Sequence, residues 1–139
     1  MKAEIIAIGS ELLLGQIVDT NTSYIAKHLA ENGIELNRTI TVGDDLQRVK
    51  EVIREGIDRS QIVITTGGIG PTEDDLTREA VAEVFKRPLT FQPRLMEQIE
   101  DLFKKRGFRM AENNRKQAYI PEGSIPIENP KGTAPGFIV

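Results

Sequence analysis

Apolar residues recur along this chain in two kinds of pattern, short β-branched runs and longer stretches with helical spacing. The β-branched runs predict three strands, over residues 3–8, 34–42 and 61–66. Apolar residues three or four positions apart predict four helices. Three of them span 21–32, 75–86 and 93–106. The other begins at Asp44 or Asp45, and its inner face is expected to contain Leu46, Val49, Val52, Ile53 and Ile57. Alternation of strands and helices is typical of an α/β fold with a mostly parallel sheet.

The last third of the chain has a weaker pattern. After Gly107 we expect irregular structure, with short strands at 124–128 and at the end of NPKGTAPGFIV. Because no repeat or linker divides the sequence, we expect a single domain over residues 1–139. The chain stops within the apolar run FIV, so we expect this domain to be truncated at its C-terminal end.

Composition narrows the class of protein. Hydrophobic residues make up 39% and charged residues 28%, which is typical of a globular chain. The net charge of −3 and the lack of a basic block argue against a nucleic-acid partner. The absence of cysteine excludes disulfides and thiolate nucleophiles. No apolar run reaches the roughly 20 residues of a membrane span and no signal peptide is recognisable, so we expect no membrane association and a cytoplasmic location.

Candidate chemistry follows the ends of the predicted strands, where α/β folds bind their ligands. The third strand leads into TTGGIGPTEDDLT, residues 65–77. Its flexible backbone at Gly67, Gly68 and Gly70 can present N–H groups to an anion. Pro71 stiffens the turn, and Thr72 can cap a helix or contact a phosphate. The segment matches neither a P-loop nor a dinucleotide fingerprint.

Three acids, Glu73, Asp74 and Asp75, follow this glycine-rich loop at once. In one interpretation they lie in the first turn of the next helix and only stabilise its dipole. In the other, Asp75 or Asp74 binds Mg²⁺, which prefers one or two carboxylates together with substrate phosphates. A metal would explain why carboxylates stand beside a phosphate-binding loop.

Other candidates lie near the first two strands. Asp19 precedes the first helix, and Asp44 and Asp45 open the second, so each is a candidate N-cap as well as a candidate cleft residue. Ser10 and Glu11 follow the first strand in GSELLLG, where Glu11 can face a cleft while the leucines pack.

Three further features complete the candidates. His28 is the only histidine, and we interpret it as an ordinary surface or half-buried residue rather than a catalytic one. Arg115 and Lys116 can bind phosphate or form a solvated charge pair, and both interpretations stay open. A second small-residue turn that permits close approach of a ligand contains Gly132, Thr133 and Ala134.

The motifs GSELLLGQIVDTN, TTGGIGPTEDDLT, NRKQAYIP and NPKGTAPGF together resemble the N-terminal domain of the competence/damage-inducible CinA family. That domain is in turn similar to the molybdopterin-binding domain of molybdenum-cofactor biosynthesis proteins. The resemblance covers essentially the whole chain. It implies a three-layer α/β/α fold, a homo-oligomer, and a cleft for a phosphorylated nucleotide or pterin with Mg²⁺.

The resemblance also implies roles for individual residues. The glycine loop, which contains Gly67, Gly68 and Gly70, corresponds together with Thr72 to the phosphate loop. Asp75 with Asp74 corresponds to the metal position, and Asp19 corresponds approximately to another acid near the cleft. The turn at 132–134 corresponds to a second ligand loop. The function implied is metal-dependent hydrolysis of a nucleotide pyrophosphate such as ADP-ribose, with Asp19 or Asp44 orienting the attacking water. Alternatives are molybdopterin binding or adenylyl transfer in cofactor biosynthesis, and a non-catalytic ligand-binding module.

Two departures from the family pattern bear on activity. A Leu-Pro-Gly-x-Pro-x-Glu-Met stretch that follows in CinA-type domains is absent from this sequence. So is the domain that deamidates nicotinamide mononucleotide, to which such domains are commonly fused. The resemblance therefore implies a role in pyridine-nucleotide recycling for a longer protein.

Overall fold

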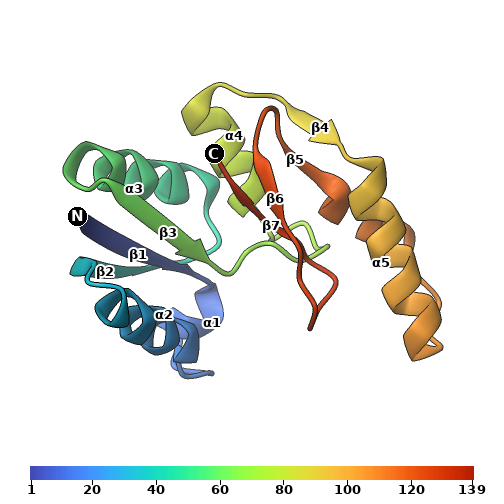
Figure 1. Ribbon diagram of the computed structural model, residues 1–139, viewed down its shortest axis with the longest axis horizontal. Helices are drawn as coiled ribbons and strands as arrows, with labels where there is room; N and C mark the ends of the chain where they lie inside the picture. Colours follow the sequence, from blue (N-terminus) through green and yellow to red (C-terminus); the bar gives the residue numbers. More distant parts are fainter. The chain divides into compact units, whose positions relative to one another are not determined.

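The computed structural model describes all 139 residues, which divide into two compact units. The N-terminal unit is Met1–Gly68 and the C-terminal unit is Ile69–Val139. Figure 1 labels their helices and strands. None of the helices combines the length and apolar character required to cross a membrane.

The N-terminal unit is built on a three-stranded parallel sheet in the order β2-β1-β3. Its strands are β1 (Lys2–Ile8), β2 (Glu35–Val42) and β3 (Ile62–Thr66). In β1, all residues after Lys2 are buried, as expected of a central strand flanked on both sides.

Helices cover both faces of this sheet, with α2 (Thr20–Glu31) on one face and α3 (Leu46–Arg59) on the other (Figure 1). Side chains of β1 alternate between the two faces. Leu29 of α2 packs with Ala3 and Ile5 of β1. On the other face, Gly56 of α3 lies against Val63 of β3. The unit is thus a three-layer α/β/α arrangement, which confirms the predicted fold class.

A single buried acid interrupts this apolar interior. Glu4, 1% exposed, accepts hydrogen bonds from Arg59 Nε and Nη2, both at 3.0 Å, and from Ser60 Oγ at 3.1 Å. The hydrogen bonds from Arg59 lower the pKa of Glu4 and, with that from Ser60, outweigh the opposing effect of burial. The carboxylate ties β1 to the end of α3.

The C-terminal unit consists of short elements. Its helices are α4 (Thr77–Phe85), α5 (Pro93–Arg106) and the 3₁₀ helix η1 (Glu112–Ala118). Its strands form two antiparallel pairs, β4 (Leu89–Phe91) with β5 (Tyr119–Pro121) and β6 (Ile125–Ile127) with β7 (Gly136–Ile138). A separate core joins α5 to the β4–β5 pair through Leu95, Met96, Ile99, Ala118 and Ile120.

Three local predictions were wrong. Helix α4 begins at Thr77, so Asp74 and Asp75 precede it, because their loop is closed by side-chain hydrogen bonds instead of helical ones. The stretch after Gly107 is not irregular throughout, since it contains η1 and β5. Ile57, expected on the inner face of α3, is 38% exposed.

Candidate functional site

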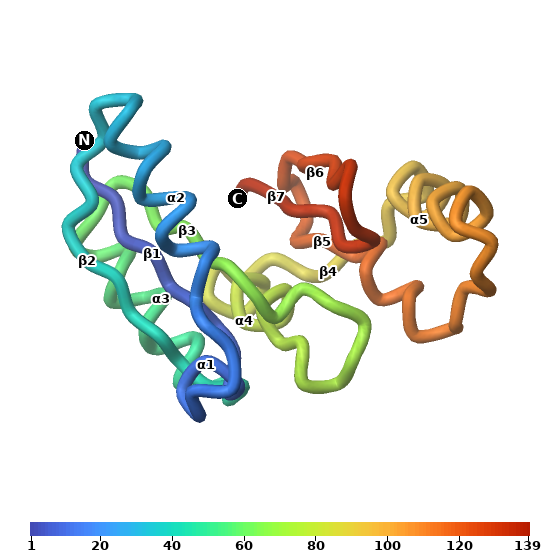
Figure 2. Tube along the Cα trace, turned by 90° about the horizontal axis from the view of Figure 1, so that it is seen from below, coloured from blue at the N-terminus to red at the C-terminus, as the bar shows by residue number.

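The carboxyl edge of the N-terminal sheet is held together by a reciprocal pair of hydrogen bonds. Ser10 opens α1 (Ser10–Leu13), a single turn directly after β1, and Asp44 follows β2. Ser10 N–H donates to Asp44 Oδ2 at 3.1 Å, and Asp44 N–H donates to Ser10 Oγ at 3.0 Å. A Cβ at Gly43 would lie only 3.2 Å from Ser10 Oγ. Figure 2 shows α1 at this end of the sheet.

The aspartates of this edge differ in how many of their oxygens are engaged. Asp19 caps α2 with both, because Oδ1 accepts from Thr22 N–H at 3.0 Å and Oδ2 from Thr22 Oγ1 at 2.5 Å. Asp45 caps α3 by accepting from Arg48 N–H at 2.9 Å. Asp44, the other candidate cap, instead holds Ser10 with one oxygen, Oδ2.

Glu11 and the start of α2 also approach strand ends. The Glu11 carboxylate folds back over Gly9, where a Cβ would meet Oε1 at 2.5 Å. Asn21 Nδ2 donates to Thr66 Oγ1 at 3.0 Å and so joins the N-terminus of α2 to the last residue of β3. The three strand ends and one helix N-terminus therefore gather at one edge of this unit, as the sequence predicts for an α/β fold.

The glycine loop requires glycine at its first position. Gly67 has φ 91° and Gly68 has φ 65°, both in the left-handed region. A Cβ on Gly67 would collide with the backbone carbonyl oxygen of Ile8 at the end of β1. The chain passes from the N-terminal to the C-terminal unit directly after Gly68.

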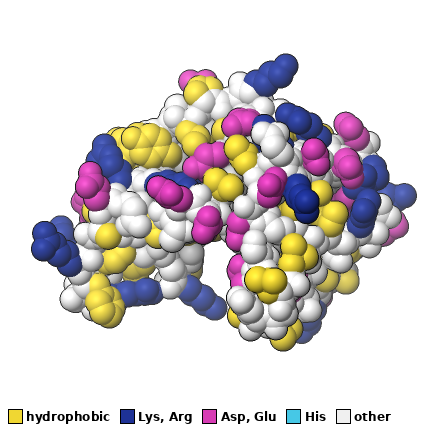
Figure 3. Space-filling model, turned by 180° about the vertical axis from the view of Figure 1, so that it is seen from behind, with side chains coloured by type: hydrophobic (Ala, Val, Ile, Leu, Met, Phe, Trp, Pro, Cys, Tyr) yellow, Lys and Arg dark blue, Asp and Glu magenta, His cyan; other side chains and the backbone are white.

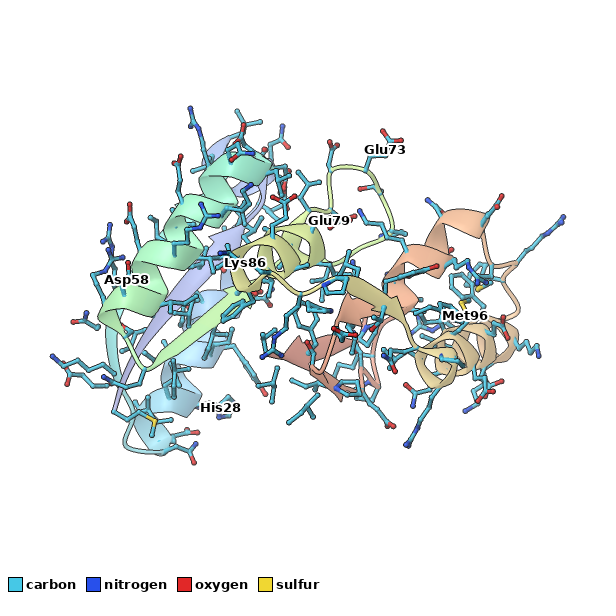
Figure 4. The ribbon with its side chains drawn as sticks, turned by 90° about the horizontal axis from the view of Figure 1, so that it is seen from above. His28, Asp58, Glu73, Glu79, Lys86 and Met96 are labelled. Carbon is cyan, nitrogen blue, oxygen red and sulfur yellow. The ribbon has the colours of Figure 1, made fainter.

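Residues 70–75, the acidic loop, are closed by Asp75. Its Oδ2 accepts from Thr72 N–H at 2.9 Å and from Thr72 Oγ1 at 2.7 Å. Burial acts to raise the pKa of Asp75, but these bonds, one from Gly70 N–H and the charge of Lys116 together lower it. Asp75 is therefore ionised at neutral pH. Figure 4 shows Glu73 at the outside of the loop, and Asp74 beside it is also exposed.

Lys116 of η1 holds the acidic loop through two of its carbonyl oxygens. Its Nζ donates to the carbonyl oxygens of Thr72 at 2.8 Å and Asp75 at 2.5 Å, and lies 3.3 Å from Glu79 Oε1. The ammonium is thus engaged with the protein itself. Its neighbour Arg115 stacks over the Phe91 ring at 4.4 Å. Lys116 is therefore not a solvated charge, whereas Arg115 is exposed to solvent.

Arg78 is a fully buried cation under the same loop, with 0% of its surface exposed. It donates to the carbonyl oxygens of Gly70, at 3.2 Å, and Ile69. Burial lowers the pKa of this guanidinium, while the charges of Glu79 and Asp75 oppose that effect. Arg78 and Glu79 are not predicted from the sequence, because a charged residue in an amphipathic helix ordinarily indicates the solvent face.

The second predicted ligand loop, residues 129–135, is organised by two amides. Asn129 Oδ1 accepts from the N–H groups of Lys131, at 3.0 Å, and Gly132, at 2.9 Å, and Asn129 Nδ2 donates to Ala134 O at 2.9 Å. Gln117 Nε2 of η1 donates to Thr133 Oγ1 at 3.1 Å. No pattern in the sequence points to Gln117, because its partner Thr133 is distant in the chain.

The donor set of the acidic loop fits Mg²⁺ only in a form that takes most of its ligands from water and substrate. No group of three or more Asp, Glu, His or Cys side chains is arranged to enclose a metal. Asp75 is ionised, and its hydrogen bonds from Thr72 reach Oδ2 alone. Mg²⁺ is commonly held by one or two carboxylates together with phosphates, so Asp75, with Asp74 beside it, fits that pattern.

On the face of the molecule shown in Figure 3, Lys and Arg side chains are interspersed with Asp and Glu side chains. This face therefore has no large patch of purely positive or purely negative charge. His28 lies on the exposed side of α2, with Nδ1 2.8 Å from Glu31 Oε2 and its ring against Tyr24 (Figure 4). It contacts none of the candidate residues.

Comparison with known proteins agrees with this architecture. A family model described as "Probable molybdopterin binding domain" matches residues 4–139. A putative competence-damage inducible protein of Caldicellulosiruptor saccharolyticus is 55% identical over the whole chain, which covers 34% of that relative. The chain thus spans about a third of the length of the curated relatives it matches.

Solved structures give the same result. The crystal structure of the protein CinA from Thermoplasma acidophilum, whose function is described as unknown, is 36% identical with a TM-score of 0.87, covering 98% of this chain and 79% of that one. The tungsten cofactor synthesizing protein MoaB from Pyrococcus furiosus shares the fold, with a TM-score of 0.60 at 18% identity, covering 98% of this chain and 79% of that one. The chain therefore belongs to the molybdopterin-binding domain family and, within it, to the CinA-like proteins.

Proposed function

We propose that this domain binds a phosphorylated nucleotide and hydrolyses its pyrophosphate bond, with ADP-ribose as the substrate. One observation carries the proposal. An ionised carboxylate, Asp75, is held by Thr72 and lies eight residues after Gly67, a position that must be glycine. A loop that presents backbone N–H groups attracts phosphate, and a nearby fixed carboxylate attracts the cation that accompanies it.

The loop of residues 67–70 binds phosphate oxygens through backbone N–H groups such as that of Gly68, while the N–H of Gly70 already donates to Asp75. Lys116 and Arg78 take no direct part in this binding, because both already donate to carbonyl oxygens of residues 69–75. Their role is to keep the acidic loop in one conformation. Glycine N–H groups held in this way stabilise charge without reorganising during the reaction.

A carboxylate at the edge of the N-terminal sheet orients the attacking water. Of Asp19 and Asp44, Asp44 is the better candidate, because Asp19 uses both carboxylate oxygens to cap α2 whereas Asp44 uses one to hold Ser10. Ser10 keeps that carboxylate in a fixed orientation through two hydrogen bonds. Glu11 stays a candidate for contact with the ligand at the same edge.

The reaction consumes one water and no other reactant. The water oxygen forms a bond to one phosphorus, the bond from that phosphorus to the bridging oxygen breaks, and the bridging oxygen leaves on the other phosphate. The products are AMP and ribose 5-phosphate, with the water protons transferred to the carboxylate and to solvent or product oxygens. Mg²⁺ bound at Asp75, with Asp74 beside it, supplies neutralisation of the phosphate charge.

A second function is favoured by the family match, whose description names molybdopterin. The ligand would then be a phosphorylated pterin, bound by the same glycine loop and by the turn at 132–134, with adenylyl transfer as the further step. We also propose that the domain assembles as a homo-oligomer. Because the relatives are about three times as long, a deamidase domain in the complete protein remains part of the proposal.

The test is to incubate the protein with ADP-ribose and Mg²⁺ and to separate AMP and ribose 5-phosphate by chromatography. We expect wild type to form AMP and Asp75→Asn to lose on the order of a hundredfold in rate, since one electrostatic contact in an active site contributes about that much. The asparagine keeps a carbonyl oxygen for Thr72, so circular dichroism should show an unchanged fold. Equal rates for both proteins would contradict the mechanism. Binding of molybdopterin without cleavage of ADP-ribose would favour the second function.

A further inference from the structure

A row of hydrogen bonds crosses the interior of the C-terminal unit and ends at the second ligand loop. It begins at the backbone N–H of Ala111, which donates to Asn114 Oδ1 at 3.1 Å. Asn114 Nδ2 donates to Gln117 Oε1 at 3.1 Å, and Gln117 Nε2 donates to Thr133 Oγ1 at 3.1 Å. We call this row the amide relay.

The direction of the relay is fixed by its first member. A backbone N–H can only donate, so the Asn114 atom that faces it must be the oxygen. The Asn114 amide nitrogen therefore faces Gln117, and the same reasoning places the Gln117 nitrogen against Thr133. Gln117 is 1% exposed and Asn114 is 7% exposed, so water does not readily substitute for either partner.

The relay determines what Thr133 can offer to a ligand. Because Thr133 Oγ1 accepts from Gln117, its own O–H hydrogen points elsewhere and is available as a donor. Thr133 lines a cavity of about 640 Å³ between α5 and residues 128–135. Lys105 lines the same cavity as a second donor, and Asp101 and Glu128 line it as acceptors.

From this geometry we propose that Gln117 is a positioning residue that makes Thr133 a hydrogen-bond donor to an acceptor oxygen of the bound nucleotide, on a phosphate or on the ribose. The inference rests on the proposed function only for the identity of the ligand. Asn114 and the Ala111 backbone act through Gln117, which touches no ligand itself.

The decisive variant is Gln117→Glu, which keeps the size of the side chain and reverses its last hydrogen bond. The carboxylate still accepts from Asn114 Nδ2, but it also accepts from the Thr133 O–H, which is then lost to the ligand. Binding of ADP-ribose is measured by calorimetry without divalent ions, so that no turnover occurs. We expect Gln117→Glu to weaken binding on the order of tenfold, the usual size of one hydrogen bond to a charged or well-placed group.

Four further variants separate orientation from simple structural support. Thr133→Val should weaken binding by the same factor, and Thr133→Ser should bind as wild type does. The double variant Gln117→Glu with Thr133→Val should bind no worse than Thr133→Val alone, because the two changes remove the same interaction with the ligand. Gln117→Met provides no acceptor for the Thr133 O–H and should weaken binding less than Gln117→Glu. Thermal unfolding of each variant checks that the unit remains folded.

The results distinguish this inference from the proposed hydrolysis. If wild type binds ADP-ribose without cleaving it, hydrolysis fails while the binding test still stands. Equal affinity of Gln117→Glu and wild type would overturn the inference, as would equal losses in Gln117→Glu and Gln117→Met, or additive losses in the double variant. If ADP-ribose does not bind, the same series is measured with inorganic pyrophosphate and with adenosine, which offer phosphate and ribose oxygens separately. Failure of wild type to bind any of the three would also overturn it.

Discussion

The two units of the chain fix their candidate residues by different means. In the N-terminal unit, Asp19 and Asp45 each bond to a backbone N–H three residues ahead. In the C-terminal unit, the acidic loop is supported by Lys116, which lies 41 residues beyond Asp75. Local capping leaves a recognisable sequence pattern, whereas distant side-chain contacts do not. The aspartates of the first unit are therefore held by neighbours in the sequence, whereas the acidic loop of the second unit also depends on a side chain distant in the chain.

The largest effect on stability is expected from Gly67→Ala in the N-terminal unit. We expect it to lower the free energy of unfolding by roughly 3 kcal/mol, because the new Cβ meets the Ile8 carbonyl at a strained φ of 91°. The matched control is Gly33→Ala, where φ is 69° but nothing lies within 4 Å, and where we expect about 1 kcal/mol. Urea unfolding measures both. Equal losses would show that the approach of the loop to β1 does not matter.

The corresponding test in the C-terminal unit is Lys116→Met. It leaves the carbonyl oxygens of Thr72 and Asp75 without their donor and Glu79 without its cation, so we expect a loss of roughly 2 kcal/mol. The pKa of Asp75 should rise, because Lys116 helps to lower it. Carboxyl titration followed by NMR and thermal unfolding measure the two effects. Lys104→Met, at an exposed position of α5, should change neither, and an unchanged Asp75 pKa in Lys116→Met would contradict the support assigned to this lysine.

Asp19 provides a smaller effect that separates capping from catalysis. Asp19→Ala removes the N-cap of α2 and should destabilise the protein by about 1 kcal/mol. Asp19→Asn caps as well as aspartate does, so its stability should be unchanged. If Asp44 rather than Asp19 orients the water, Asp19→Asn should also retain its rate of AMP formation. A large loss of rate at unchanged stability would instead return that role to Asp19.

The smallest effect concerns the buried acid of the N-terminal unit. The pKa of Glu4 lies below its ordinary value of 4.5 in the folded protein. Its contribution to stability is therefore complete above about pH 4.5 and is lost as the pH falls through the lowered pKa. Glu4→Gln should flatten the acid limb of a stability profile that is measured by urea unfolding from neutral pH down to roughly two units below the ordinary glutamate pKa. An unchanged slope in the variant would show that other carboxylates dominate that limb.

These expectations also show how far sequence reasoning reaches. The sheet, α2, α3 and α5 follow from β-branched runs and helical spacing, and the family resemblance and fold class were confirmed. The turn at Gly33 follows a helix end, where its φ of 69° is expected. Such features depend on neighbours within a few residues, so the local sequence contains enough information to predict them.

The start of α4 and the contacts of the second unit depend on distant partners. Asp75 and its neighbour Asp74 looked like first-turn helical acids, but the hydrogen bonds from Thr72 close a loop before the helix begins. Arg78 has the position of an ordinary helical arginine until the carbonyl oxygens of Ile69 and Gly70 are known to lie beside it. The roles of the predicted ligand and metal residues stay predictions until binding is measured.

The direction of hydrogen-bond donation along the amide relay depends on one backbone N–H group. The side-chain amides of Asn114 and Gln117 and the hydroxyl of Thr133 can donate along the row in either of two directions. The two arrangements differ only in a 180° flip of each amide group and a rotation of the hydroxyl hydrogen. Proline in place of Ala111 would remove the single N–H that distinguishes them while leaving every side chain of the relay in place. The row would then lose its preferred sense, and Thr133 would alternate between donor and acceptor. The backbone N–H of Ala111, which does not line the cavity, thus determines whether the Thr133 hydroxyl inside the cavity is a donor or an acceptor.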